Sequence, residues 1–132
     1  MASTFLLKII TPNKDVYEGQ VGKVFLKNDD GELEVLANHE NMITTTIPSV
    51  TKFIDGQGVT KELFISTAVV SVTKGAMTIC SDAAEFPEEI DFIRAEKAKE
   101  RAAEKLKEPD KYDKVRDQLS LLRACERLKL RK

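Results

Sequence analysis

Few side chains in this sequence could carry out chemistry. His39 is the only histidine, so no second imidazole is available to orient it or to share a metal ion with it. No glycine-rich segment of the G-x-x-x-x-G-K-[ST] type occurs, which excludes the phosphate loop of many nucleotide-hydrolysing enzymes. The other acids and hydroxyls are scattered as on an ordinary solvated surface. The sequence therefore predicts a protein that is not an enzyme, has no metal site and requires no cofactor.

Three arginines are more informative. Arg123 and Arg127 are four residues apart, so on a helix they lie on one face, where like charges repel. Arg94 lies near the start of the preceding helical segment, and an antiparallel helix pair would bring all three arginines together. Guanidinium groups suit a bidentate grip on phosphate or carboxylate. The alternative interpretation is a solvated basic face, with Glu126 and other nearby acids as local partners.

The elements that must position these arginines change in character near residue 86. Up to residue 85 the pattern is that of short β-strands, separated by turns at Gly31, Gly56, Gly58 and Gly75. Many short strands with such turns indicate a sandwich or a barrel, and we assign residues 1–85 to an all-β domain. The expected strands are 4–10, 21–27, 32–36, 42–47, 50–54, 59–66, 68–73 and 76–81.

Residues 86–132 have the pattern of a helical hairpin. Pro87 suits the first turn of a helix, and no residue from Ile90 to Lys107 breaks one. Pro109 ends that helix, and a second is expected from about Asp110 to Leu130. Each helix has a narrow stripe of small and apolar residues. The stripes are Ala95, Ala98, Ala102 and Leu106 in the first helix, and Leu121, Ala124, Cys125 and Leu128 in the second. Alanines bury little area, so the contact is expected to be weak.

Charge divides the chain in the same way. Residues 94–132 contain fourteen Lys and Arg against eight Asp and Glu, a net charge of +6, whereas the whole chain carries −1. The preceding residues therefore carry −7. An overall charge near zero argues against nucleic acid as a partner, and no window approaches the roughly 20 apolar residues of a membrane helix. Cys80 and Cys125 are interpreted as reduced packing residues.

The order of several short motifs resembles the epsilon subunit of bacterial F-type ATP synthases. The opening Phe5…Ile10-Thr11-Pro12 is similar to the family's first strand and Thr-Pro turn, and Gly31-Glu32-Leu33 followed by His39 resembles its Gly-Glu-Leu…His segment. The stretch from Ile90 to Ala95 is similar to the Ile/Leu-Asp-x-x-Arg-Ala motif of members that bind ATP. Arg123 to Leu128 resembles the family's Arg-Ala-x-x-Arg-Leu. The family's glycine after Glu-Leu is Glu34 here, and its Pro-Gly before the histidine is Ala37-Asn38.

The resemblance implies a rotor subunit. Its fold would be a flattened β-sandwich of about ten strands, followed by an antiparallel two-helix hairpin. The sandwich would couple the gamma subunit to the c-ring at the cytoplasmic face of the bacterial membrane, without inserting into it. Glu32 and His39 would lie on the edge that faces ring or shaft. The alternative is that Glu32 is an ordinary carboxylate in a hairpin, and that His39 is a turn residue whose hydrogen bonds are satisfied locally.

The resemblance also implies that the hairpin is a switch. Folded on the sandwich it would permit ATP hydrolysis; extended along gamma toward the beta and alpha subunits it would inhibit hydrolysis. ATP, with or without Mg²⁺, would be a regulatory ligand that stabilises the folded hairpin. The implied ATP contacts are Ile90, Asp91 and Ala95 around the adenine and ribose, with Glu85 near the same pocket. Arg94, Arg123 and Arg127 would meet the phosphates.

Two other interpretations remain at this point. The chain could be a purely structural coupling subunit, whose hairpin never opens and binds no nucleotide. It could also be an independent RNA- or peptide-binding β-domain with a basic tail, although six Phe, two Tyr and no Trp leave few aromatic side chains for such a surface.

Overall fold

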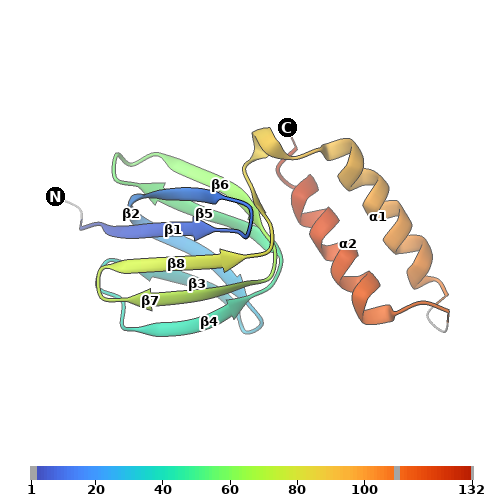
Figure 1. The fold of residues 1–132 in the computed structure, drawn as a ribbon, viewed down its shortest axis with the longest axis horizontal. Helices are drawn as coiled ribbons and strands as arrows, with labels where there is room; N and C mark the ends of the chain where they lie inside the picture. Colours follow the sequence, from blue (N-terminus) through green and yellow to red (C-terminus); the bar gives the residue numbers. More distant parts are fainter. Residues whose placement is uncertain (1–2, 109–110, 132) are drawn as a thin grey trace.

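A computed structural model describes residues 3–108 and 111–131 of the chain. Nine strands in these residues come first and two helices follow, the helices lying to one side of the strands (Figure 1). The strands are β1 (Phe5–Ile10), β2 (Asp15–Asn28), β3 (Gly31–Leu36), β4 (Met42–Thr46), β5 (Ser49–Asp55), β6 (Thr60–Ile65), β7 (Ala68–Thr73), β8 (Ala76–Ser81) and β9 (Ala84–Glu85).

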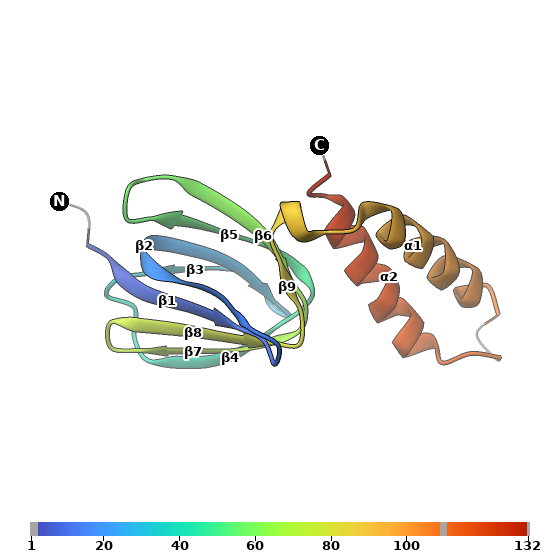
Figure 2. The same ribbon diagram turned by 45° about the horizontal axis from the view of Figure 1, so that its top comes forward.

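The strands form an open sheet that folds over on itself into two layers (Figure 2). Their order is β4-β7-β8-β1-β2-β5-β6-β9, with β3 paired to β2 beside this path. Only the contact between β1 and β8 is parallel. The first half of β2 pairs with β1 and its second half with β3 and β5, and the β2–β5 register shifts between Val21 and Lys23. This one long strand therefore joins the two layers.

Alternation along the strands builds one apolar core between the layers. In β1, Phe5, Leu7 and Ile9 are buried while Lys8 is exposed, the period-two pattern of a strand with one face on a core. Phe53, Leu63 and Met77 are fully buried in the same cluster. The sandwich therefore has a continuous interior made by its own strands, without a contribution from the helices.

The helical part begins with a single 3-10 turn, η1 (Pro87–Glu89), and continues with α1 (Phe92–Leu106) and α2 (Lys114–Leu128). Asp91 and Asp113 cap the two helices, because their carboxylates accept the backbone N–H groups of Arg94 and Arg116 at 3.0 and 3.1 Å. Within the part of the chain that the structure describes, no helix is long and apolar enough to span a membrane.

A small second apolar cluster joins the base of the hairpin to the sandwich. Phe64 of β6, Ile90 after η1 and Leu130 after α2 are buried against one another. Leu130 is 9% exposed and Ile90 7% exposed. The two ends of the hairpin thus meet at one point on the sandwich, whereas the far ends of the helices extend away from it (Figures 1 and 2).

The predicted fold class is confirmed: a β-sandwich of many strands, followed by a two-helix hairpin. Several boundaries differ. The structure describes nine strands where about ten were expected, β2 begins at Asp15 rather than Val21, and the two-residue β9 was missed. The second helix begins at Lys114, since Asp113 provides the cap; the predicted start, Asp110, lies outside the described residues.

The first helix also starts later than predicted. Pro87 begins the 3-10 turn instead, Ile90 is extended, and α1 starts after Asp91. The physical reason is that Ile90 is buried against Phe64 and Leu130. The prediction of an uninterrupted helix from Pro87 used local signals alone and did not include this contact.

Candidate functional site

The predicted arginines meet at a hollow of about 470 Å³, formed by the hinge before α1 and the facing sides of both helices. This volume lies within the range of small-molecule sites. Its lining is polar and charged except for three alanines. The residues around it are Glu85, Glu89, Asp91, Arg94, Ala95, Ala98, Arg101, Ser120, Arg123, Ala124 and Arg127.

Arg127 is held against the sandwich by two contacts. Its Nε donates to Glu85 Oε1 at 2.6 Å, and its guanidinium carbon lies 4.3 Å from the centre of the Phe64 ring. The two contacts are adjacent because the pairing of the short strand β9 with β6 places Glu85 opposite Phe64. The side chains of Arg127 and Glu85 are 25% and 31% exposed, so this ion pair is partly shielded from water.

The other three arginines of the hollow have no carboxylate partner among the described residues. Arg123 is half-buried, and its Nε donates to Ser66 Oγ at 3.1 Å. Arg94 and Arg101 are exposed, seven residues apart on α1. Three positive groups therefore border one hollow without local neutralisation.

Three acids of the hollow have other partners. Glu85 pairs with Arg127, and Asp91 caps α1. Glu89 forms an ion pair with Lys14, which reaches over from the β1–β2 turn, and accepts the backbone N–H of Phe86 at 3.3 Å. The Lys14 hydrogen bond, with help from the Phe86 N–H, lowers the pKa of Glu89 below its ordinary value. The hollow therefore has a surplus of positive charge, and guanidinium forks suit a polyanion such as a chain of phosphates.

The structure brings together six of the seven residues predicted to contact nucleotide. These are Glu85, Asp91, Arg94, Ala95, Arg123 and Arg127. Ile90 does not line the hollow, because it is buried in the cluster with Phe64 and Leu130. Sequence reasoning missed Glu89, Ala98, Arg101, Ser120 and Ala124. The position of Arg101, two helical turns after Arg94 on the same face, could have identified it.

The two residues predicted to face ring or shaft do not line this hollow, and they border two different hollows. Glu32 is exposed on β3 and borders a hollow beneath α2. His39 is half-buried after β3 and borders another hollow, with Leu36 and Asn38. His39 Nδ1 lies 2.8 Å from the Glu40 carbonyl oxygen, which can only accept, so Nδ1 carries the proton.

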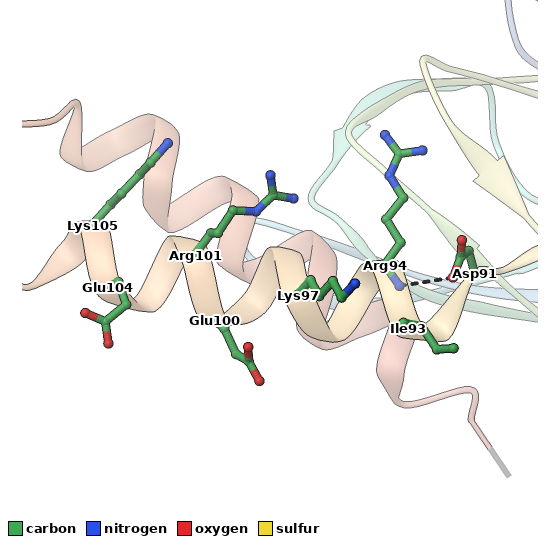
Figure 3. A pocket seen from close by; sticks show the side chains of 8 residues that line it. All are labelled: Asp91, Ile93, Arg94, Lys97, Glu100, Arg101, Glu104 and Lys105. Atoms are coloured by element: carbon green, nitrogen blue, oxygen red, sulfur yellow. Dashed lines mark hydrogen bonds between the residues drawn. The ribbon is translucent and has the colours of Figure 1, made fainter.

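A larger hollow, of about 890 Å³, runs along the outer side of α1 (Figure 3). All eight residues that line it belong to Asp91–Lys105. Arg94 and Arg101 project to one side of the helix, and Glu100 and Glu104 project to the other (Figure 3). A surface made by one helix cannot enclose a ligand, so the smaller hollow between the helices is the better binding site.

Sequence comparisons cover the whole chain. Residues 4–87 match the family described as ATP synthase, Delta/Epsilon chain, beta-sandwich domain. Residues 88–131 match ATP synthase, Delta/Epsilon chain, long alpha-helix domain. A relative named ATP synthase epsilon chain, from Clostridium botulinum strain Eklund 17B, is 54% identical over 132 residues, which are 100% of this chain and 98% of the relative.

Two solved structures have the same fold. One is a chain in a Euglena gracilis mitochondrial ATP synthase structure titled OSCP/F1/c-ring, with a TM-score of 0.82 and 23% identity over 93% of this chain and 78% of that one. The other belongs to a Tetrahymena thermophila mitochondrial ATP synthase structure titled central stalk/cring, with a TM-score of 0.55 and 14% identity over 65% of this chain and 69% of that one.

Proposed function

This chain belongs to the ATP synthase delta/epsilon family, as an epsilon chain, and from that premise we propose that it is a non-catalytic rotor subunit whose hairpin responds to ATP. The observation that carries the proposal is the hollow between the helices, where Arg94, Arg101 and Arg123 have no carboxylate partner among the described residues. A phosphate chain is the ligand that their charge and geometry favour.

The sandwich is the proposed anchor. The solved relatives belong to structures whose titles name a central stalk and a c-ring, which supports gamma and the c-ring as its partners here. Glu32 and His39 are the residues proposed to face ring or shaft, and the complex would lie at the cytoplasmic face of the membrane. The sandwich has its own apolar core, which supports this role, because its contacts with the rotor would not depend on the position of the helices.

The hairpin is the proposed switch. Its helices bury only alanines as apolar residues, Ala95, Ala102 and Ala124, so separating them exposes little apolar surface. Its net positive charge also suits an acidic surface on the beta or alpha subunits. A ligand of moderate affinity can shift the equilibrium between two conformations when their free energies differ by a few kcal/mol.

ATP would act as a regulator that favours the closed hairpin. Arg94, Arg101 and Arg123 would contact the phosphates. Arg127 would also contact them, by giving up part of its ion pair with Glu85. Asp91 and Ala95 would face the ribose and base, and Ile90 would support them from the apolar cluster. Each arginine comes from one of the two helices, so the ligand would hold the helices together.

Calorimetric titration of the full-length chain with ATP, with and without Mg²⁺, tests this proposal. Saturable binding is expected, and Arg123→Ala should weaken it at least ten-fold, since a hydrogen bond to a charged group contributes about 1.5–3 kcal/mol. Arg116→Ala is the matched control, because Arg116 is an exposed arginine of α2 that does not line the hollow. No binding at millimolar ATP, or equal effects of the two variants, would contradict the site.

Deletion of residues 87–132 tests the switch in the assembled synthase. An inhibitory hairpin predicts faster ATP hydrolysis after the deletion, with assembly retained. One observation favours the alternative of a passive structural brace: Glu85 and Ser66 already hold Arg127 and Arg123 without any nucleotide. The brace predicts unchanged hydrolysis or failed assembly in the same experiment.

A further inference from the structure

The described residues include only two buried charged side chains, and both belong to α2, the helix that would have to move. Asp117 is 5% exposed and Glu126 is 4% exposed. Charged groups are seldom buried to this degree without a partner, because desolvation costs more than most interactions return. Both lie on the helix that the proposed switch would move, and no strand of the described sandwich has a buried charged side chain.

The two carboxylates have different surroundings. Glu126 borders the hollow beneath α2, and Lys129 Nζ lies 2.5 Å from its Oε2, an ion pair by distance although not in hydrogen-bond geometry. Asp117 forms no ion pair with a described residue, and its Oδ2 is buried without a hydrogen-bond partner among them. Asp117 is therefore the carboxylate with a buried oxygen, Oδ2, that no ion pair or hydrogen bond among the described residues compensates.

Asp117 lies in the seam between the two helices. Ala95 and Ala124 both line the hollow near the base of the hairpin. Because the helices are antiparallel, seven residues forward from Ala95 and seven back from Ala124 lead to Ala102 and Asp117. Both are buried, and this end of α2 lies away from the sandwich (Figures 1 and 2). Of the described elements, α1 is thus the one that covers Asp117.

The charged groups of α1 on the turns adjoining Ala102 form no ion pair with Asp117. These groups are Arg101 and Lys105, and neither is in an ion pair with a described residue. Both side chains project from the side of α1 opposite to that of Glu100 and Glu104 (Figure 3). On α2 itself, Asp113 is used as the cap and adds a second negative charge one turn away.

We propose that Asp117 is a built-in weak point of the α1–α2 seam: its buried, unpartnered carboxylate keeps the closed hairpin close to opening. When the helices separate, the carboxylate regains water, and this gain offsets the small loss of alanine contacts. The importance of this weak point for regulation rests on the proposed switching function. The physical effect itself concerns the isolated chain.

The position of Asp117 on the helix also has an effect that favours the closed state. Asp117 lies in the first turn of α2, where a negative charge favours the helix through the helix dipole by a factor of about two to five in equilibrium. Burying a polar group without a partner disfavours the closed state by a factor of about 5 to 150, and more for a charge. Desolvation is the larger effect, so neutralising Asp117 should stabilise the seam.

Hydrogen exchange of the full-length chain without nucleotide tests this inference. Asp117→Asn removes the charge at nearly constant shape, and it should slow exchange of the α1 and α2 amides about ten-fold while the sandwich amides stay unchanged. Glu100→Gln is the matched control: it removes one negative charge from an exposed position of α1, and it should change exchange less than two-fold.

Asp117→Ala provides a second measurement. It removes the carboxylate entirely and places a residue of higher helix propensity opposite Ala102. Exchange of the α1 and α2 amides should therefore be slowed at least as much as in the Asn variant. Unchanged or faster exchange in the Asn variant, with sandwich amides intact, would overturn the proposal by showing that the carboxylate is hydrated or paired when the hairpin is closed. Because the experiment contains no ATP, this failure is distinct from a failure of the nucleotide site.

Discussion

The sandwich and the hairpin differ in how many large apolar side chains they bury. The sandwich encloses sixteen buried apolar residues in one cluster, whereas the two helices bury three alanines, an aspartate and a glutamate. The hairpin is fastened mainly at its base, by the cluster of Phe64, Ile90 and Leu130 and by the contacts of Arg123 and Arg127. Beyond the base, the only buried apolar residues of the described helices are the three alanines.

This difference separates two requirements that a switching rotor subunit would have to meet. An anchor has to keep its shape under load, which dense apolar packing provides. A switch has to change state for a ligand or partner, which requires states of similar free energy. Placing the small residues and the buried charges in the hairpin, and the large apolar residues in the sandwich, would allow the hairpin to open while the sandwich stays folded.

Truncating the sandwich core should have the largest effect. Phe53 is fully buried at the centre of the cluster, so Phe53→Ala should lower the free energy of unfolding of the chain by about 3–5 kcal/mol. Ile43→Ala is the control, because Ile43 is 78% exposed and its loss should cost less than about 0.5 kcal/mol. Urea denaturation followed by circular dichroism measures both; equal effects would mean that the sandwich core is not the main source of stability.

Removing the apolar fastener at the base should release the hairpin without unfolding the sandwich. Leu130→Ala should lower the free energy of docking by about 1.5–2 kcal/mol, the contribution expected for a nearly buried leucine. Faster hydrogen exchange in α2 with unchanged exchange in β5 and β8 is the expected result. Leu36→Ala, at a position that is 48% exposed, should change neither. Parallel loss of protection in helices and strands would indicate one cooperative unit.

The ion pair at the base should contribute less than the apolar cluster. A double-mutant cycle of Arg127→Ala and Glu85→Ala should give a coupling free energy of about 1 kcal/mol for hairpin docking, since the pair is only partly shielded from water. Arg127→Ala alone should cost more, because it also removes the contact with the Phe64 ring. A coupling near zero would show that Phe64, rather than Glu85, holds Arg127.

The smallest effect concerns the hinge between the two regions. The Lys14 contact lowers the folded-state pKa of Glu89 below the ordinary 4.5, so its stabilisation is present above that value and is lost as the pH falls through the lowered pKa. Both side chains are more than a third exposed, which limits the contribution to below about 1 kcal/mol.

Lys14→Ala should therefore raise the pKa of Glu89 toward 4.5 and flatten the acid dependence of hinge stability. The shift should be incomplete, because the Phe86 N–H still donates to the carboxylate. An NMR titration of the Glu89 side-chain carboxyl measures this. Lys8→Ala, which removes an exposed lysine that pairs with Glu18 elsewhere, should leave the Glu89 pKa unchanged.

Much of this architecture could be predicted from local patterns. Period-two alternation located most strands, and the absence of helix breakers between Ile90 and Lys107 located the first helix. The family motifs led to six of the residues that line the hollow. The boundaries that failed depend on distant partners: β9 exists because Glu85 pairs opposite Phe64, and α1 starts late because Ile90 is buried at the base.

The sequence by itself determined the two-part organisation, the charge of each part and the side chains available to hold an anion, because periodicity, breakers and charge are local properties of the chain. Only the tertiary structure decided which arginines keep their charge uncompensated, since Glu85, Ser66 and Lys14 come from strands or turns far away in sequence. It also decided that Asp117, an ordinary surface residue by its type, is buried in the seam between the helices. Burial depends on what packs across from a residue, and no local pattern carries that information.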